Sequence, residues 1–112
     1  MKDLIKQLRK FASDRDWDQF HSPKNLAMAL SVEVAELLEH FQWLTETQSH
    51  VKDPEKLDEI KQEIGDVLIY LTMLSDKLGI DSLKAAKDKI KINHQKYPAG
   101  MVKGKAKKYN ER

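Results

Sequence analysis

Two short stretches of similar sequence, EVAELL at residues 33–38 and EIGDVL at residues 63–68, constrain the fold more than any other feature. In both, an acidic residue, an apolar residue, a small residue and a second acidic residue precede two apolar residues. The surrounding apolar residues recur with the period of an α-helix. A short internal repeat, or one helix geometry used twice, would explain the match. The chain is therefore predicted to contain two amphipathic helices with acidic side chains bordering their apolar faces.

Four helices are predicted from the apolar periodicity and from residues that favour helix ends. The expected spans are Asp3–Arg15, Pro23–Leu44, Pro54–Leu78, and a last helix from Asp81 or Ser82 to about Pro98. Ser22 and Asp53 each precede a proline at the first helical position, and Gly79 suits the end of the third helix. With only four Gly and three Pro and no convincing strand pattern, the chain is predicted to be an all-α four-helix bundle.

The apolar faces of the second and third helices are expected to form the core. The expected core residues are Leu26, Leu30, Val34, Leu37, Leu38 and Phe41 in the second helix, and Ile60, Ile64, Val67, Leu68, Leu71 and Leu74 in the third. A chain of 112 residues buries a modest core by itself, and helical proteins often extend theirs by self-association.

Composition excludes several classes of protein and suggests one domain, residues 1–98, followed by a basic tail, residues 99–112. The absence of Cys excludes disulfides and thiolate metal sites. No signal peptide or membrane-spanning run is recognised, so a cytoplasmic protein is expected. From Met101 onward, five basic residues oppose Glu111, a local charge of +4. This tail is expected to be solvated or to contact an anion such as phosphate.

The acidic residues of the two helices are predicted to face one cleft. At about 100° per residue, positions 33, 36, 40 and 43 share one strip, and positions 63, 66, 70 and 73 share another. Antiparallel packing through the apolar faces would bring four carboxylates together: Glu33, Glu36, Glu63 and Asp66. Single E-x-x-E pairs are common on solvated helix surfaces, and Glu39 has that character because it rotates away from the strip. Two pairs that both border a core face favour a binding site.

Converging carboxylates repel one another and raise each other's pKa, so the arrangement is costly without a counterion. Hard divalent cations supply one, and Mg²⁺ in particular binds a few carboxylates together with waters and substrate phosphates. A softer metal is less well supported because the chain has no Cys and His is rare near the acids. A ferritin-like di-iron site would require E-x-x-H, whereas Glu36 and His40 are four residues apart.

Several separated blocks of the chain resemble the all-α nucleoside triphosphate pyrophosphohydrolases of the MazG-like superfamily. EVAE and EIGD resemble the E-x-x-E and E-x-x-D motifs of that family. Five further stretches look like its dCTP pyrophosphatase branch, namely RDWDQFHSPKNLAMAL, FQW, DVLIYL, KIKINHQKYP and KKYNE. The resemblance covers nearly the whole chain from Arg15 onward, whereas the first helix and the 45–57 connection contribute little.

The resemblance implies a Mg²⁺-dependent enzyme, with Mn²⁺ as a substitute, that cleaves a nucleoside triphosphate to the monophosphate and pyrophosphate. By position, its metal ligands would be Glu33, Glu36, Glu63 and Asp66. Phosphoryl chemistry depends mainly on charge neutralisation and positioning. A carboxylate that the metal does not fully engage could orient or deprotonate the attacking water, and Glu36 and Glu63 are the candidates for this catalytic role.

The same resemblance implies a set of substrate-binding residues. They are Trp17, Asp18, Gln19, Phe20 and His21, then Trp43 and Tyr70, and finally Lys89, Asn93, Lys96 and Tyr97. Aromatic rings offer flat faces on which a base can stack, and His21 could donate to a base edge or sugar hydroxyl. The last four residues are candidates for the phosphate end. The WDQFH block favours cytosine nucleotides, dCTP or a 5-modified dCTP, as in house-cleaning of the nucleotide pool.

The protein is also expected to self-associate, and two functions other than catalysis are considered. Single-domain members of the family form dimers or tetramers in which a neighbouring chain completes the pocket, so a homodimer or homotetramer is implied. The main alternative is a non-catalytic helical interaction module whose acidic faces contact a basic partner. Nucleic-acid binding through the basic tail is a further alternative. It is disfavoured by the acidic clusters and by a net charge of only +2.

Overall fold

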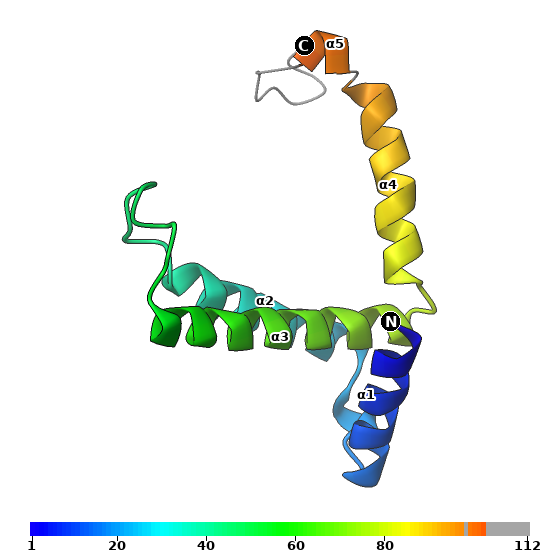
Figure 1. Ribbon diagram of the computed structural model, residues 1–112. Helices are drawn as coiled ribbons and strands as arrows, with labels where there is room; N and C mark the ends of the chain where they lie inside the picture. The colour runs from blue at the N-terminus through cyan, green and yellow to red at the C-terminus, as the bar shows by residue number, and fades with distance from the viewer. Residues whose placement is uncertain (98, 103–112) are drawn as a thin grey trace. The chain divides into compact units, whose positions relative to one another are not determined.

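The structure is a computed structural model that describes residues 1–97 and 99–102. Its elements are α1 (Lys2–Asp14), the 3-10 helix η1 (Asp18–Phe20), α2 (Pro23–Glu39), α3 (Pro54–Lys77), α4 (Ser82–Lys96) and the single turn α5 (Ala99–Val102) (Figure 1). The described residues contain no strand, which confirms the all-α prediction. None of the helices within these ranges is long and apolar enough to cross a membrane.

The predicted helix boundary residues act at the ends of three helices. The Ser22 hydroxyl accepts a hydrogen bond from the Asn25 amide at 3.1 Å, which caps α2. The Asp81 carboxylate caps α4 by accepting from the Lys84 amide at the same distance. Gly79 follows α3 with φ of 67°, a left-handed conformation that glycine adopts without steric cost. Local sequence therefore accounts for where these helices begin and end.

The predicted end of α2 at Leu44 is wrong, because the helix ends at Glu39. Beyond it, the amides of His40 and Phe41 donate to carbonyls only three residues back, those of Leu37 and Leu38. Such bonds tighten the final turn and stop the regular i to i−4 ladder. Residues 40–53 then form a run of turns that connects α2 to α3.

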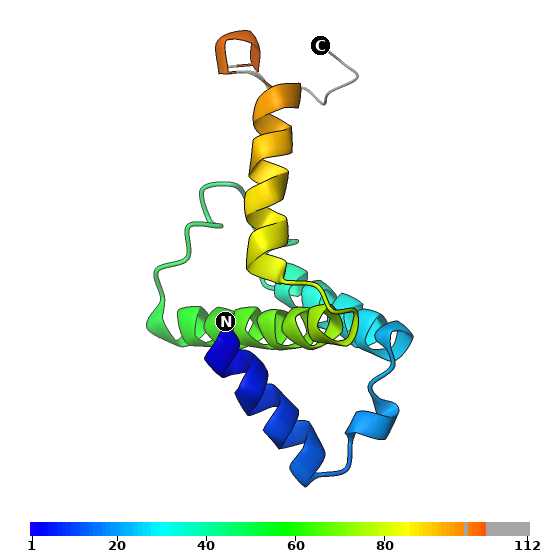
Figure 2. The same cartoon turned by 90° about the vertical axis from the view of Figure 1, so that its right-hand side faces the viewer.

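The chain divides into two compact units, Met1–Gly79 and Ile80–Arg112. In the first unit, α2 runs antiparallel along α3, and α1 contacts α3 near its C-terminal end (Figures 1 and 2). The connection formed by residues 40–53 lies at the opposite end of the α2–α3 pair. The second unit contains α4 and α5, and α4 has no buried residue. The first unit is built from α1, α2 and α3. A four-helix bundle that includes α4 and a single domain of residues 1–98 stay predictions.

The core of the described chain is small. Its buried residues are Ala12, Leu26, Ile60 and Thr72, and Leu26 is only 1% exposed. Much of the expected core is not buried within one chain. The expected core residues that remain exposed are Val34, Leu38, Ile64, Leu68 and Leu71. We call these five residues the apolar strip. No helix of the first unit covers them, which is the physical reason why the predicted core is incomplete.

Candidate metal and nucleotide site

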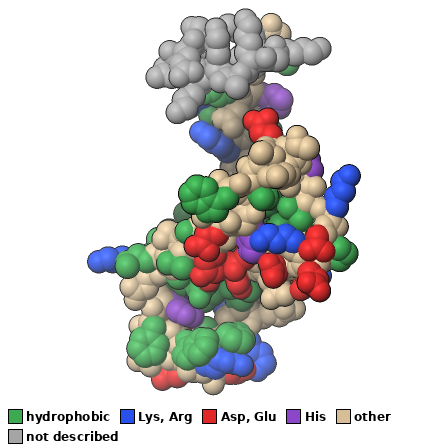
Figure 3. Space-filling view, turned by 90° about the vertical axis from the view of Figure 1, so that its left-hand side faces the viewer, with side chains coloured by type: hydrophobic (Ala, Val, Ile, Leu, Met, Phe, Trp, Pro, Cys, Tyr) green, Lys and Arg blue, Asp and Glu red, His purple; other side chains and the backbone are tan. Residues whose placement is uncertain are grey.

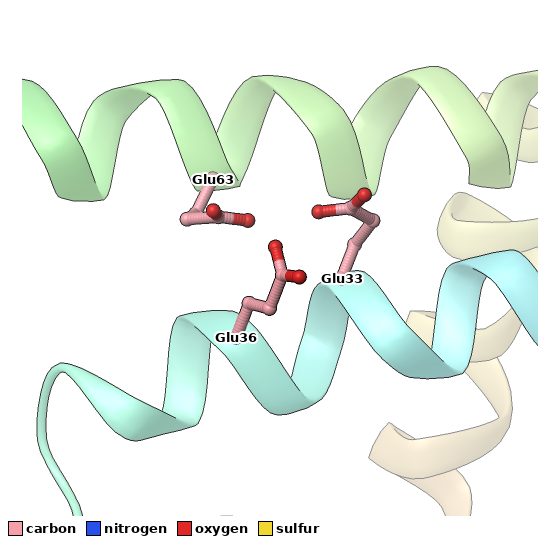
Figure 4. Close-up of side chains that lie close together, drawn as sticks. All are labelled: Glu33, Glu36 and Glu63. Atoms are coloured by element: carbon pink, nitrogen blue, oxygen red, sulfur yellow. The ribbon is translucent and has the colours of Figure 1, made fainter.

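The candidate site is a cluster of three carboxylates from two helices, which we call the acid centre. Glu33 and Glu36 extend from α2, and Glu63 extends from the facing turns of α3 (Figure 4). One carboxylate oxygen of each residue lies within 4.8 Å of the others. The i, i+3 spacing places the first two on one side of α2. Antiparallel packing of the two helices brings the third residue against them.

Burial and neighbouring charges change the protonation of the acid centre. The pKa of Glu33 is raised to about 7, first by burial and then by hydrogen bonds with the carboxyl groups of Glu63 and Glu36. The negative charges of Glu36 and Asp66 raise it further. Two carboxyl groups can share a hydrogen bond only if one of them holds a proton. Near neutral pH and without a bound cation, Glu33 therefore retains a proton that an ordinary carboxylate would have lost in a large share of the molecules.

Two oxygen atoms of the acid centre, Glu33 Oε2 and Glu63 Oε2, are buried and have no hydrogen-bond partner within residues 1–97 and 99–102. Among the described residues, no Lys or Arg forms an ion pair with any of the three carboxylates. Buried carboxylate oxygens without partners are unfavourable. Metal coordination would satisfy them, and an all-oxygen donor set suits hard divalent cations. The acid centre can therefore bind a metal ion.

Asp66, the fourth predicted ligand, is half-buried on α3 and lies outside the three-carboxylate cluster. It is close enough for its charge to raise the pKa of Glu33. Its participation in metal binding stays a prediction.

Acidic side chains gather on one face of the protein and are bordered there by hydrophobic side chains (Figure 3). On α2 and α3, exposed apolar side chains that neighbour the acidic residues in sequence include Val34, Leu38 and Ile64, as the helical periodicity indicates.

The aromatic block before α2 is not gathered around the acid centre within one chain. The ring of Trp17 packs edge-on against Phe11 with centroids 5.6 Å apart, and the Arg15 guanidinium lies over the Phe11 ring. Phe20 is exposed. The Gln19 side-chain amide donates to the Asp16 carbonyl at 3.0 Å. These contacts shape the turn between α1 and α2.

Asp18 and His21 instead line a cleft of about 440 Å³ between α1 and α3. Asp18 forms an ion pair with Lys77 at 2.6 Å, and His21 is half-buried. The other lining residues are Ile5, Leu8, Arg9, Ala12, Ser13, Thr72, Met73, Asp76 and Lys77. No motif or periodicity in the sequence predicted this cleft. The available signal was the strip of positions 63, 66, 70 and 73, which continues with the same spacing to Lys77.

The remaining predicted substrate residues lie in three places. Trp43 follows α2 and is 87% exposed, whereas Tyr70 is half-buried on α3. Lys89 and Asn93 are exposed on α4, and Lys96 and Tyr97 at its end are half-buried. All four belong to the second unit, Ile80–Arg112, whereas the acid centre belongs to the first. The basic residues predicted to contact an anion, from Lys103 to Arg112, lie outside the described residues.

Comparison with known proteins defines the class to which this fold and site belong. The chain matches the MazG-like family over residues 28–111 and belongs to that family. This match includes the acid centre, Asp66 and the four predicted substrate residues Lys89, Asn93, Lys96 and Tyr97.

Individual relatives narrow the class. The chain is 38% identical over 113 aligned positions to dCTP pyrophosphatase 1 of Homo sapiens and of Mus musculus. Each alignment covers 99% of this chain and 66% of the relative, so the chain spans about two thirds of the length of these curated proteins. A pyrophosphatase from Archaeoglobus fulgidus of known crystal structure matches with a TM-score of 0.77 and 44% identity. That match covers 88% of this chain and 92% of the other.

Proposed function

We propose that this protein is a Mg²⁺-dependent nucleoside triphosphate pyrophosphohydrolase that releases a nucleoside monophosphate and pyrophosphate. The observation that carries this proposal is the acid centre, where three carboxylates converge and two of their buried oxygens have no partner in the described part of the chain. Membership of the MazG-like family and similarity to two kinds of named pyrophosphatase support it. The names of the mammalian relatives favour dCTP as the substrate. A 5-modified dCTP is proposed beside it because of the sequence pattern at residues 17–21.

Glu33, Glu36 and Glu63 would hold the metal ion, with Asp66 as a fourth ligand. When bound, Mg²⁺ would supply positive charge that offsets the charge of the triphosphate. Mn²⁺, another cation that prefers oxygen ligands, would substitute.

The chain's own catalytic contribution would be proton transfer and positioning. Glu36 or Glu63 would accept a proton from the water molecule that attacks phosphorus. The water oxygen then forms a bond to the α-phosphorus. The bond from this phosphorus to the oxygen that bridges the α- and β-phosphates breaks, and pyrophosphate leaves with the electron pair. Tyr70 lies one helical turn after Asp66 on the same side of α3, a position suited to the nucleoside. Lys89, Asn93, Lys96 and Tyr97 are proposed to contact the phosphates.

Self-association would cover the apolar strip that a single chain leaves exposed. The apolar strip is adjacent to the acid centre in sequence and is exposed in a single chain. Exposed apolar area of this kind marks an interaction site in soluble proteins. A second copy of the chain, in a cytoplasmic homodimer or homotetramer, is the proposed cover. Light scattering coupled to size exclusion should give a mass of two or four chains, and replacing Leu38 and Leu68 by Lys should reduce that mass.

The test of the proposed function is pyrophosphate release from canonical and 5-modified nucleoside triphosphates, with Mg²⁺ and with EDTA. Wild type should release pyrophosphate only with the metal, and Glu63→Gln should not. Preference for dCTP or a 5-modified dCTP would support nucleotide-pool house-cleaning of cytosine nucleotides. Lack of release on every triphosphate by well-folded protein would refute the enzyme and favour the non-catalytic interaction module.

A further inference from the structure

Two adjacent residues near the C-terminal end of α3 hold two different elements of the chain. Asp76 accepts hydrogen bonds from the Arg9 guanidinium, which joins α3 to α1. Lys77 forms an ion pair with Asp18 at 2.6 Å, which joins α3 to η1. The first pair strengthens a contact between packed helices, whereas the second holds a short turn that has no buried residue. Helix packing alone therefore does not account for the Lys77–Asp18 pair.

The turn that Lys77 reaches belongs to residues 17–21, which we call the WDQFH segment. Because no residue of η1 is buried, apolar packing does little to hold the segment in place. Within residues 1–97 and 99–102, its other hydrogen bonds stay inside the segment or reach adjoining residues of the chain. Examples are the bonds from the Trp17 amide to the Ala12 carbonyl and from the Asn25 side chain to the Phe20 carbonyl. Lys77 supplies the polar link from the segment to α3.

The backbone next to the segment also depends on contacts that hold it. Asp16 has φ of 54°, in the left-handed region that residues other than glycine adopt uncommonly. Such a conformation persists where the surrounding contacts fix it. The Gln19 side-chain amide donates to the Asp16 carbonyl at 3.0 Å, and Lys77 holds the neighbouring Asp18. Loss of the ion pair would therefore release this turn more readily than it would release a regular helix.

The acid centre and the anchor of the WDQFH segment lie on one helix. Glu63, Asp66, Tyr70, Met73 and Lys77 are spaced alternately by three and four positions, so they follow one side of α3. Glu63 and Lys77 are separated by about four helical turns, or roughly 20 Å along the axis. Hydrogen bonds along the helix keep this separation constant. The ion pair therefore fixes how far the WDQFH segment lies from the metal-binding carboxylates.

We propose that Lys77 is a positioning residue, which holds the WDQFH segment at a set distance from the acid centre, with Asp18 as its anchor instead of a contact to the nucleotide. This inference rests on the proposed function, because it takes other residues of the segment, such as His21, to contact the bound nucleotide. Without Lys77, the segment would sample other positions. The apparent affinity for substrate would then fall with the fraction of molecules in which the segment is in place.

Steady-state kinetics of dCTP hydrolysis with Mg²⁺ test this role. A partly exposed ion pair shifts an equilibrium by up to about fivefold, so Lys77→Met should raise KM roughly threefold to fivefold and leave kcat nearly unchanged. Lys10→Met also removes a lysine and its ion pair, but that pair lies within α1. It is the matched control and should keep the KM of wild type. Unchanged KM in Lys77→Met would refute the positioning role.

Exchange of the two charges distinguishes an anchor from a substrate contact. Asp18→Lys places two lysines opposite each other and should raise KM further than Lys77→Met does. Adding Lys77→Asp to this variant restores the ion pair in reverse and should return KM to within about twofold of wild type. A direct contact from Asp18 to the nucleotide would not be restored by a new charge on α3. A double variant with the KM of Asp18→Lys would therefore overturn the proposal and assign Asp18 to the nucleotide.

Backbone order parameters from NMR relaxation separate failure of this inference from failure of the proposed function. In protein without nucleotide, the order parameters of residues 18–20 should fall in Lys77→Met and recover in the charge-exchanged double variant, while those of α2 stay unchanged. This result would support Lys77 as the anchor even if wild type hydrolysed no triphosphate, which would refute the proposed function alone. Unchanged order parameters in Lys77→Met would overturn the proposal.

Discussion

The two halves of α3 place carboxylates in opposite electrostatic surroundings. Toward the N-terminal half, Glu63 faces Glu33 and Glu36, and the described residues supply no basic partner. Toward the C-terminal end, Asp76 is held by Arg9. Burial and neighbouring carboxyl groups raise the pKa of Glu33, whereas the guanidinium lowers the pKa of Asp76. One helix thus carries an uncompensated site that needs a ligand and a compensated site that holds α1 in place.

The largest expected effect comes from breaking the uncompensated site. Glu63→Gln keeps the size of the side chain but removes a charge that the metal requires and a candidate proton acceptor. Pyrophosphate release should fall by about 100-fold or more. Asp76→Asn, at the compensated end of the same helix, is the matched control and should retain most activity if the protein remains folded. Equal losses in the two variants would contradict the distinction between the two ends.

Binding of Mg²⁺ should stabilise the protein through the acid centre and should not depend on the Arg9–Asp76 pair at the C-terminal end of α3. Saturation with Mg²⁺ at about 100 times its dissociation constant stabilises a folded protein by about 2.7 kcal/mol if only the folded state binds. The melting temperature of wild type should therefore rise with Mg²⁺ and return with EDTA. Glu33→Gln should abolish this rise, and Asp76→Asn should keep it. A rise that persists in Glu33→Gln would place the metal elsewhere.

The pH dependence of stability should have opposite signs at the two ends. The pKa of Glu33 is raised from about 4.5 to about 7, so in metal-free protein this group stabilises the fold below pH 4.5 and loses that contribution as pH rises through 7. The lowered pKa of Asp76 means that its contribution is present above the ordinary carboxyl pKa of 3.8 and is lost as pH falls through the lowered value.

Urea unfolding of metal-free protein at a series of values between about pH 3 and pH 8 separates these contributions. The free energy of unfolding at each pH is obtained by linear extrapolation to zero urea. Glu33→Gln should flatten the decline between about pH 4.5 and 7. Asp76→Asn should instead reduce the loss of stability at the acidic end. Curves for the two variants that change in the same pH window would show that the ends of α3 are not electrostatically distinct.

The smallest effect is expected from the ion pair that holds α1. Arg9 is exposed, and exposed ion pairs contribute little and are weakened by salt. Arg9→Met should lower the melting temperature slightly at low salt and by less at high salt. Lys10→Met, which breaks an i, i+4 pair within α1, is the control for loss of helix charge. A large, salt-independent loss in Arg9→Met would mean that its packing, and not its charge, holds α1.

Sequence alone determined the local features of this protein. Helix starts at Pro23, Pro54 and Ser82 and the stop at Gly79 follow from residues whose backbone preferences act over one or two turns. Helical periodicity placed acidic side chains beside the apolar faces of α2 and α3. The end of α2 was misplaced because its apolar pattern continues to Leu44, while the hydrogen-bond ladder stops at Glu39. Periodicity records which face is apolar and does not record where the ladder stops.

Only the tertiary structure decided which of these residues meet. The helical strips predicted that four carboxylates converge. Helix packing brings Glu33, Glu36 and Glu63 into one cluster, and Asp66 lies outside that cluster. It also leaves the apolar strip exposed and pairs Arg9 with Asp76, 67 positions apart in sequence. A pattern of period 3.6 specifies the direction of a side chain about its own helix. The offset and angle between helices depend on packing across the chain, which no local pattern contains.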